Sequence, residues 1–328
     1  MEPAAFPWPT AGALALATAV ALVWDARFGE PPPRLHPVVG MGRVLAALGR
    51  RVAPMAGGVM RPGRDFTVGA LAWTLGAAAV VALAVGVQAP LLSGTPWWVQ
   101  GLALGVLLKP LLAWRMLRDE VAAVEASLVR GLEAGRAQVA RLVSRDVQAL
   151  DDAGVRQAAL STLAENLNDS VVAPLFWFAL AGLPGAALYR WANTADAMWG
   201  YRGVRGGRDW TWAGRWAARA DDVLSWLPAR LTAVLLLLVS GRAVPGNVLR
   251  AQAQRTPSPN GGWPMAALAL RLGVRLEKPG VYVINASGRL PVPADTARAL
   301  AWGGGVVAGW GALLVAGLTL AAVLGRPS

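Results

Sequence analysis

Residues 66–92 read FTVGALAWTLGAAAVVALAVGVQAPLL and contain no charged side chain. About 20 consecutive apolar residues are enough for a helix to cross the hydrocarbon core of a bilayer. Residues 3–24 and 299–325 are equally free of charge, and residues 97–114 are interrupted only by Lys109. These four segments therefore predict membrane-spanning helices.

Two further apolar segments are interrupted. Residues 170–189 carry the turn-forming Gly182-Leu183-Pro184-Gly185 in their middle, and residues 224–240 contain Arg230. Broken or charge-bearing apolar segments usually face protein or a polar cavity, although a kinked span and a snorkelling arginine would give the same pattern. We expect an all-α polytopic membrane protein with about four to six transmembrane or re-entrant helices and sizeable polar loops.

Composition supports the membrane assignment. Hydrophobic residues make up 55% of the 328-residue chain and charged residues 15%, whereas soluble proteins carry about 25% charged residues. The net charge of +12 comes mainly from arginines between apolar runs, which favours contact with anionic lipid over nucleic-acid binding. The chain has no cysteine, which excludes thiolate chemistry, and His36 alone excludes a site built from several histidines.

The polar loops carry the arginines and predict the orientation. Residues 1–10 hold no Lys or Arg, so the first apolar run is expected to be a retained span and not a signal peptide. By the positive-inside rule the loops are mostly cytoplasmic, although residues 190–222 cannot share that side with the last loop if each interrupted segment crosses once. We treat residues 1–328 as a single membrane-embedded enzyme domain in the cell (inner) membrane, with polar loops at 25–65, 115–169, 190–222 and 242–298.

Two loop segments are expected to be folded. Leu117, Val121, Val124, Leu128 and Leu132 follow one another at helical spacing, so residues 116–145 predict an amphipathic helix, weakened by its glycines. Residues 256–264 are rich in turn formers, and residues 278–284 predict a short turn and strand. We expect this last loop to form a folded lid.

The first cluster of chemically active side chains follows the first span. Asp25, Glu30 and His36 lie within 12 residues of one another around Gly29 and several prolines. The two carboxylates are candidate ligands for a cation, and His36 is a candidate acid or base. A capping role for Asp25 and simple packing of His36 remain the alternative.

Three further clusters lie beside apolar segments. On a helix Glu165 and Asp169 are i, i+4 neighbours whose repulsion a divalent cation would relieve, unless they form an ordinary solvated helix end. Asn193, Asp196 and Gly200 share a helical face, where a glycine would let a ligand approach the backbone. Asp221-Asp222 lie near Arg219 and Arg230, which suggests a cation and a phosphate side by side or an ordinary interfacial ion pair.

Together and in order, these stretches resemble the CobD/CbiB family of cobalamin biosynthesis, the adenosylcobinamide-phosphate synthases. The resemblance covers about residues 20–300 and departs from the usual family pattern at Glu30 and Ser225. The matching pieces are Asp25 to Arg43 with His36-Pro37-Val38; Ser144-Arg145-Asp146; Glu165-Asn166 with Asp169 to Pro174; Asn193-Thr194 with Asp196, Met198, Gly200 and Tyr201; Asp221-Asp222 with Pro228 to Thr232; and Pro257 to Asn260 with Gly262 to Met265.

The resemblance implies a reaction. Members of the family join the amine of aminopropanol phosphate or ethanolamine phosphate to a propionate carboxyl of adenosylcobyric acid, with ATP and Mg²⁺. Activating that carboxylate as an acyl phosphate requires a metal, cationic clamps and a base. The assigned catalytic residues are His36, Glu165, Asp169, Asp196 and Asp222, and the metal ligands are Glu165, Asp169, Asp221 and Asp222. The cofactor-binding residues, of which the three arginines are expected on phosphates, are Arg145, Asn166, Asn193, Arg219, Arg230 and Asn260.

The expected partners are the corrinoid, the aminoalcohol phosphate, the lipid bilayer and other membrane enzymes of the same pathway. A small-solute transporter would also contain broken segments with embedded charge, but the chain has no internal repeat and large polar loops. A Mg²⁺-dependent membrane transferase would carry repeated Asp-rich motifs, whereas Asp151-Asp152 and Asp221-Asp222 are the only adjacent acidic pairs of that kind.

Overall fold

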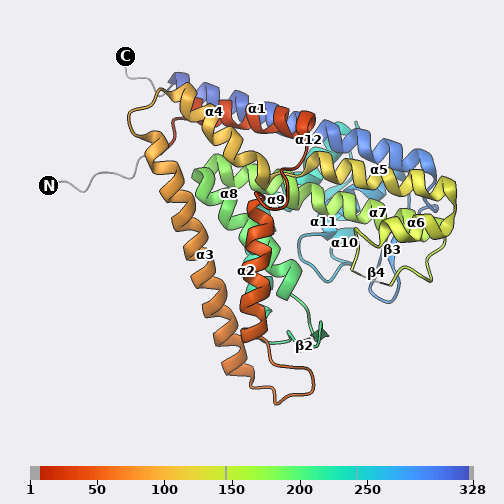
Figure 1. Cartoon of the computed structure of the whole chain (residues 1–328). Coiled ribbons are helices and arrows are strands. Elements are labelled where there is room, and N and C mark those ends of the chain that lie inside the picture. Colours follow the sequence, from red (N-terminus) through yellow and green to blue (C-terminus); the bar gives the residue numbers. More distant parts are fainter. Residues whose placement is uncertain (1–7, 145, 242, 325–328) are drawn as a thin grey trace. The chain divides into compact units, whose positions relative to one another are not determined.

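The computed structural model describes residues 8–144, 146–241 and 243–324, and helices account for most of them (Figure 1). Among these residues, six helical segments are long and apolar enough to cross a membrane: Ala11–Phe28, Pro62–Leu92, Trp97–Arg130, Asp152–Trp199, Arg215–Val239 and Pro293–Leu324. The expected all-α polytopic fold with four to six such segments is therefore confirmed, and the chain is a multi-pass membrane protein.

The six segments differ in how much of their apolar surface the protein covers. Only 17% of the most apolar window is buried in Pro62–Leu92 and in Pro293–Leu324, against 67% in Asp152–Trp199. An exposed apolar helix surface is stable in a bilayer, because lipid tails are as apolar as the side chains. Pro62–Leu92 and Pro293–Leu324 therefore leave most of their apolar surface available to lipid, whereas the protein itself covers most of the apolar window of Asp152–Trp199.

The chain divides into two compact units, and each is described by itself. The first unit comprises Met1–Leu112, Pro174–Leu224 and Leu314–Ser328. It contains α1 (Ala11–Phe28), α2 (Pro37–Val52), α3 (Pro62–Leu92), α4 (Trp97–Leu108), the 3-10 turn η1 (Lys109–Leu111), nearly all of α8 (Ala173–Trp199), strands β1 (Val204–Arg205) and β2 (Arg208–Asp209), the start of α9 (Arg215–Val239) and the end of α12 (Pro293–Leu324).

Small residues and indole rings hold the first unit together. Helix α1 lies along α4 (Figure 1), where a Cβ atom on Gly105 would come within 2.7 Å of Val20. The ring of Trp191 likewise fills the space that a side chain on Gly76 would need. The indole nitrogen of Trp199 donates a 3.2 Å hydrogen bond to the carbonyl oxygen of Leu45 on α2. Such close contacts are the usual basis of helix packing in membranes.

Helix α8 is broken where the sequence predicted an interruption. Ala181 (φ −140°, ψ 18°) and Gly182 (φ 60°, ψ −153°) leave the helical conformation. The fully buried side-chain oxygen of Gln88 on α3 accepts a 2.9 Å hydrogen bond from the backbone N–H of Leu183. A backbone donor without a partner is costly in a membrane, so Gln88 stabilises the break.

The second unit comprises Ala113–Ala173 and Ser225–Leu313. Its elements are α5 (Trp114–Arg130), α6 (Leu132–Val139), α7 (Asp152–Leu167), the π-helical turn η2 (Asn168–Val172), the rest of α9, α10 (Gly246–Ala253), α11 (Gly262–Leu272), strands β3 (Leu276–Lys278) and β4 (Tyr282–Ile284), and the larger part of α12. Strands β3 and β4 form an antiparallel hairpin, which confirms the predicted turn and strand in a folded last loop.

The single amphipathic helix expected over residues 116–145 is wrong in its extent. The apolar stripe from Leu117 to Leu128 is buried on α5, as predicted, but α5 ends at Arg130 and α6 begins at Leu132. Gly131 between them has φ 136°, a backbone conformation that side-chain-bearing residues rarely adopt. The glycine therefore ends the helix instead of only weakening it.

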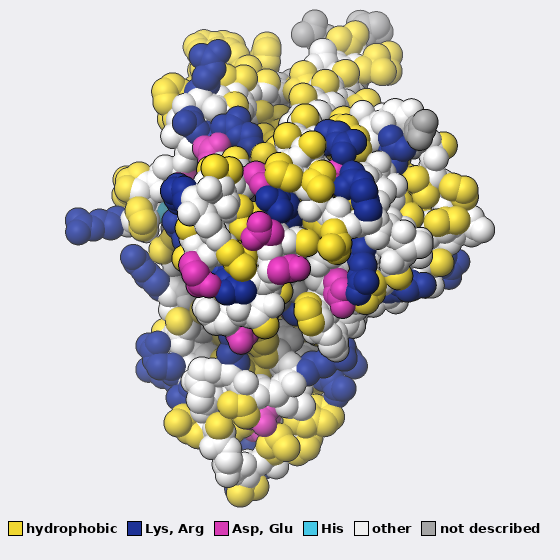
Figure 2. Space-filling model, turned by 90° about the vertical axis from the view of Figure 1, so that its right-hand side faces the viewer, with side chains coloured by type: hydrophobic (Ala, Val, Ile, Leu, Met, Phe, Trp, Pro, Cys, Tyr) yellow, Lys and Arg dark blue, Asp and Glu magenta, His cyan; other side chains and the backbone are white. Residues whose placement is uncertain are grey.

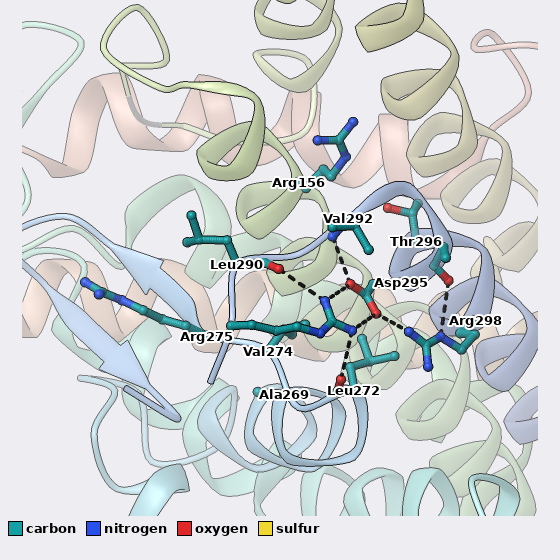
Figure 3. A network of polar contacts seen from close by, with 12 residues as sticks. Arg156, Ala269, Leu272, Val274, Arg275, Leu290, Val292, Asp295, Thr296 and Arg298 are labelled. Atoms are coloured by element: carbon teal, nitrogen blue, oxygen red, sulfur yellow. Dashed lines mark hydrogen bonds and ion pairs between the residues drawn. The ribbon is translucent and has the colours of Figure 1, made fainter. Parts of the chain in front are cut away.

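A buried carboxylate ties the last loop of the second unit to α12 (Figure 3). Arg289 donates to both oxygens of Asp295 at 2.6 and 2.8 Å, and Arg298 donates at 2.6 Å. The backbone N–H of Val292 adds a further bond of 2.8 Å, and the Asp295 residue is 0% exposed. Because a bidentate arginine–carboxylate pair fixes both distance and angle, this network positions the loop before α12.

Charged side chains on the face drawn in Figure 2 are dispersed. Lys and Arg side chains lie in several separate places among acidic and hydrophobic ones, with no single basic block on that face.

Candidate functional site

The first unit contains a buried cluster of charges. The ammonium nitrogen of Lys109 lies 3.2 Å from Asp25 Oδ1 and 3.0 Å from Glu30 Oε1, and His36 Nε2 lies 3.1 Å from Glu30 Oε2. Asp25 is 1% exposed and Lys109 is 3% exposed. The positive charge beside Asp25 and Glu30 in the structure is the Lys109 ammonium, and their role as ligands of another cation stays a prediction.

The local sequence explains how these groups meet. Gly29, with φ 69°, ends α1 just after Asp25, and a turn closed by a bond from Leu35 N–H to the carbonyl of Pro32 returns the chain to His36. Lys109 begins the 3-10 turn that follows α4. The sequence showed Lys109 only as an interruption of a span, yet a lysine in an apolar segment needs a counter-charge and should have been assigned to this cluster.

Glu30 is ionised within this arrangement. Burial alone would raise the pKa of its carboxyl, but the hydrogen bonds from His36 and Lys109 and their positive charges outweigh burial and hold the pKa below its ordinary value. The Nδ1 atom of His36 is buried and has no hydrogen-bond partner among the described residues. His36 therefore contacts a carboxylate through one ring nitrogen, and its assignment as a catalytic base stays a prediction.

Asn193 and Asp196 lie near the end of α8, also in the first unit. The position that a Cβ atom would take on Gly200 is 2.0 Å from Asp196 Oδ1, so the glycine makes room for this carboxylate. The sequence analysis expected a ligand to approach the backbone at Gly200, whereas in the structure the side chain of Asp196 from α8 occupies that space. The catalytic assignment of Asp196 and the phosphate-binding assignment of Asn193 stay predictions.

Arg219, Asp221 and Asp222 lie at the start of α9. Asp222 is half-buried and interacts electrostatically with Arg202, a partner that the sequence did not suggest. The side chain of Arg219 is exposed and forms no ion pair with any described residue. The alternative interpretation, an ordinary ion pair, is therefore not found between Arg219 and Asp222 in the described part of the chain.

The second unit brings together three of the predicted motifs, beginning at the end of α7. Here the helix widens into the π-helical turn η2, a feature often found at functional sites. Asn168 is 3% exposed; its amide donates to Asp169 Oδ1 at 2.8 Å, and its oxygen accepts a 3.2 Å bond from the Thr232 hydroxyl on α9. Asp169 is thus oriented by Asn168, which is in turn fixed by Thr232. Asn166 donates to the carbonyl oxygen of Thr162 at 3.0 Å.

Arg230 on α9 meets the loop before α11. Its Nη1 atom donates a 3.0 Å hydrogen bond to the side-chain oxygen of Asn260. Its guanidinium also lies over the rings of Trp226 and Trp263, with its central carbon 4.2 and 4.8 Å from the ring centroids. These contacts hold the positive charge of Arg230 in one place, as a preorganised anion-binding group requires.

Glu165 reaches the same loop. A Cβ atom on Gly261 would lie 3.0 Å from Glu165 Oε1, so the carboxylate borders the residue that follows Asn260. The Glu165 side chain is exposed, and Asn260 is 4% exposed. The three motifs at 165–169, 228–232 and 257–262, far apart in sequence, therefore supply carboxylate, amide and guanidinium groups to one region. The sequence predicted Glu165, Asp169, Arg230 and Asn260 here but missed Thr232 and Asn168 as supports.

The metal assignment is not tested by this arrangement. Glu165 and Asp169 belong to the second unit, and Asp221 and Asp222 to the first. Among the described residues, no group of three or more His, Cys, Asp or Glu side chains gathers as a metal-binding set. Arg145, one of the arginines predicted to bind phosphate, lies outside the described residues.

The fold and these polar regions define a helical, multi-pass membrane protein with a polar site assembled from loop motifs. The chain belongs to the CobD/Cbib protein family, whose model matches residues 18–302.

Similar proteins that carry names support the same family membership. The chain is 41% identical over 295 residues to a probable cobalamin biosynthesis protein CobD of Thermococcus kodakarensis, covering 89% of this chain and 91% of that protein. It is 39% identical over 285 residues to the corresponding Pyrococcus furiosus protein, with 86% and 90% coverage. It is 41% identical over 276 residues to cobalamin biosynthesis protein CobD of Rhodobacter capsulatus, with 81% and 84% coverage. No solved structure gives a significant match.

Proposed function

We propose that this protein acts in cobalamin biosynthesis as an adenosylcobinamide-phosphate synthase. It joins the amine of an aminoalcohol phosphate to a propionate carboxyl of adenosylcobyric acid, with ATP driving amide formation. The observation that carries the proposal is the convergence of three motifs in the second unit, where Glu165 borders the loop that Arg230 holds through Asn260. Family membership and the names of the relatives support the pathway.

The side chains suit this chemistry. A carboxylate reacts with an amine only after one of its oxygens has been converted into a leaving group, which transfer of a phosphoryl group from ATP achieves. Arg230 stabilises negative charge on phosphate, and its fixed position means that little reorganisation is needed during reaction. Glu165 has an exposed carboxylate that is able to accept a proton from the incoming ammonium.

Mg²⁺ fits the donor set of the second unit. The exposed Glu165 and the partly buried Asp169 offer carboxylate oxygens, which hard divalent cations prefer. When bound with ATP, Mg²⁺ neutralises phosphate charge. Asn168 and Thr232 keep the Asp169 carboxylate oriented through the hydrogen bonds described above.

The proposed location is the inner membrane, with the motif loops mostly in the cytoplasm. Arginine-rich loops favour that side of a membrane, and the phosphorylated substrates are water-soluble. Membrane enzymes acting earlier or later on the corrinoid are the proposed partners.

Replacing Glu165 by Gln tests the site. The change keeps side-chain volume while removing a negative charge and a proton acceptor, so product formation should fall by about 100-fold or more. The measurement is the rate of adenosylcobinamide phosphate formation by purified protein in detergent, detected by mass spectrometry. Glu133→Gln is the matched control, because the Glu133 side chain is 78% exposed and pairs only with Arg136 in the described contacts. A Glu165→Gln enzyme as fast as this control would contradict the assignment.

A further inference from the structure

A hollow of about 580 Å³ opens beside Arg230 in the second unit. It lies between α9, α10 and the loop that leads to α11. Its chemically distinctive lining residues are Trp226, Arg230, Arg250, Thr256, Ser258 and Trp263. The volume is in the range of sites that bind small organic molecules.

The lining of this hollow is positively charged. Arg230 and Arg250 contribute two cations, and no Asp or Glu among the described residues lines it. The side chain of Arg250 on α10 is exposed and makes no hydrogen bond or ion pair with any other residue in the described ranges. Two guanidinium groups with no acidic neighbour in the same hollow favour an anion as the occupant.

The two arginines differ in the contacts that hold their guanidinium groups. Trp226, Trp263 and Asn260 hold the guanidinium of Arg230, as described above. Arg250 has no such contacts, so it is able to adjust to a ligand. A fixed cation facing an adjustable one suits a group with several equivalent oxygens, such as a phosphate.

The loop adds neutral hydrogen-bonding groups. The Ser258 side-chain oxygen accepts bonds from the backbone N–H groups of Asn260 at 3.2 Å and Gly261 at 3.1 Å. Its hydroxyl hydrogen donates to no other group within the described chain and is free to point toward a ligand. The Thr256 hydroxyl, by contrast, donates to the carbonyl oxygen of Ser258 at 2.9 Å and stiffens the loop.

We propose that this hollow binds the phosphate of a small soluble organic phosphate, with Arg250 as a ligand-binding residue that the sequence did not reveal. The inference rests on the proposed function, in which two substrates carry phosphate: the aminoalcohol phosphate and ATP. Both offer the same chemistry to Arg230, Arg250 and Ser258. The occupant of the hollow is the substrate whose binding weakens when Arg250 is replaced.

The test replaces Arg250 by Ala and by Lys. Arg255→Ala is the matched control, because Arg255 is exposed, lies five residues away and contacts Val283, but does not line the hollow. Loss of one charge-assisted contact to phosphate should raise the KM for one phosphorylated substrate about tenfold to a hundredfold, with kcat nearly unchanged. Arg250→Lys should recover part of the loss, because lysine keeps the charge without the planar fork.

A second measurement does not depend on turnover. Equilibrium dialysis of purified protein in detergent, without corrinoid, measures binding of labelled aminopropanol phosphate and, separately, labelled ATP with Mg²⁺. Wild type and Arg255→Ala should bind one of these compounds equally well, and Arg250→Ala should bind that compound about tenfold or more weakly. If the protein shows this binding but forms no product, the phosphate site is supported and the proposed reaction is refuted.

Three results would overturn the inference. The first is an Arg250→Ala protein with unchanged KM values and unchanged binding of both compounds. The second is an equal loss in Arg255→Ala, which would indicate a general effect of surface charge. The third is an Arg250 effect seen only in binding to vesicles containing phosphatidylglycerol, which would make the hollow a lipid-headgroup site.

Discussion

The two polar regions of this protein use charge in opposite ways. In the first unit, Lys109, Asp25, Glu30 and His36 contact one another within 3.0 to 3.2 Å, and the lysine and Asp25 are almost fully buried. In the second unit, Arg230 and Arg250 face a hollow that no carboxylate of the described residues lines. Charges that neutralise one another inside the protein hold structure together, whereas charges left open at a hollow are available to a ligand.

The largest effect on stability is expected from Lys109→Met. Removing the ammonium leaves the carboxylates of Asp25 and Glu30 buried without their shared partner, and breaking a buried ion pair from one side typically costs about 3–5 kcal/mol. We expect a marked fall in the thermal unfolding temperature in detergent, followed by tryptophan fluorescence.

An exposed ion pair supplies the control for this comparison. Arg118 and Asp119 are 2.8 Å apart, but their side chains are 44% and 52% exposed. Pairs of this kind contribute roughly 0–1 kcal/mol, so Arg118→Met should unfold at nearly the wild-type temperature. Equal stability of Lys109→Met and Arg118→Met would show that the buried cluster does not stabilise the first unit.

A smaller, pH-dependent effect is expected from Glu30→Gln. The pKa of Glu30 lies below its ordinary value of 4.5, so its ionised form stabilises the folded state fully above that value. This contribution is lost as the pH falls through the lowered pKa. The difference in unfolding temperature between wild type and Glu30→Gln should therefore shrink as the pH falls below about 5. A difference that grows on acidification would contradict the role given to Glu30.

Local sequence patterns were sufficient to predict the membrane-spanning helices and the break in α8. Uncharged runs gave the spans, and Gly182 with Pro184 marked the break in α8. The extent of the amphipathic helix was wrong because only the structure shows Gly131 at positive φ. The partner of the break, Gln88 on α3, is 95 residues away in sequence and could not be inferred from either segment alone.

The candidate site was predicted in part for the same reason. Residue types identified Glu165, Asp169, Arg230 and Asn260 as candidates but did not predict which residues they contact. Lys109 was read as an interruption of a span because its counter-charges lie on α1 and in the loop after it. Arg250 resembled the other loop arginines, and only the hollow distinguishes it from Arg255. The roles of Lys109 and Arg250 depend on contacts with residues distant in sequence, which the local spacing of residues does not predict.

The most direct test of the proposed function is product formation by the purified wild-type protein in detergent. The assay combines adenosylcobyric acid, aminopropanol phosphate, ATP and Mg²⁺, and mass spectrometry detects the amide product, with parallel reactions lacking ATP or Mg²⁺ and ethanolamine phosphate as the alternative amine. We predict product only in the complete mixtures. No product with either amine, in a preparation that also fails to bind the corrinoid, would contradict the account.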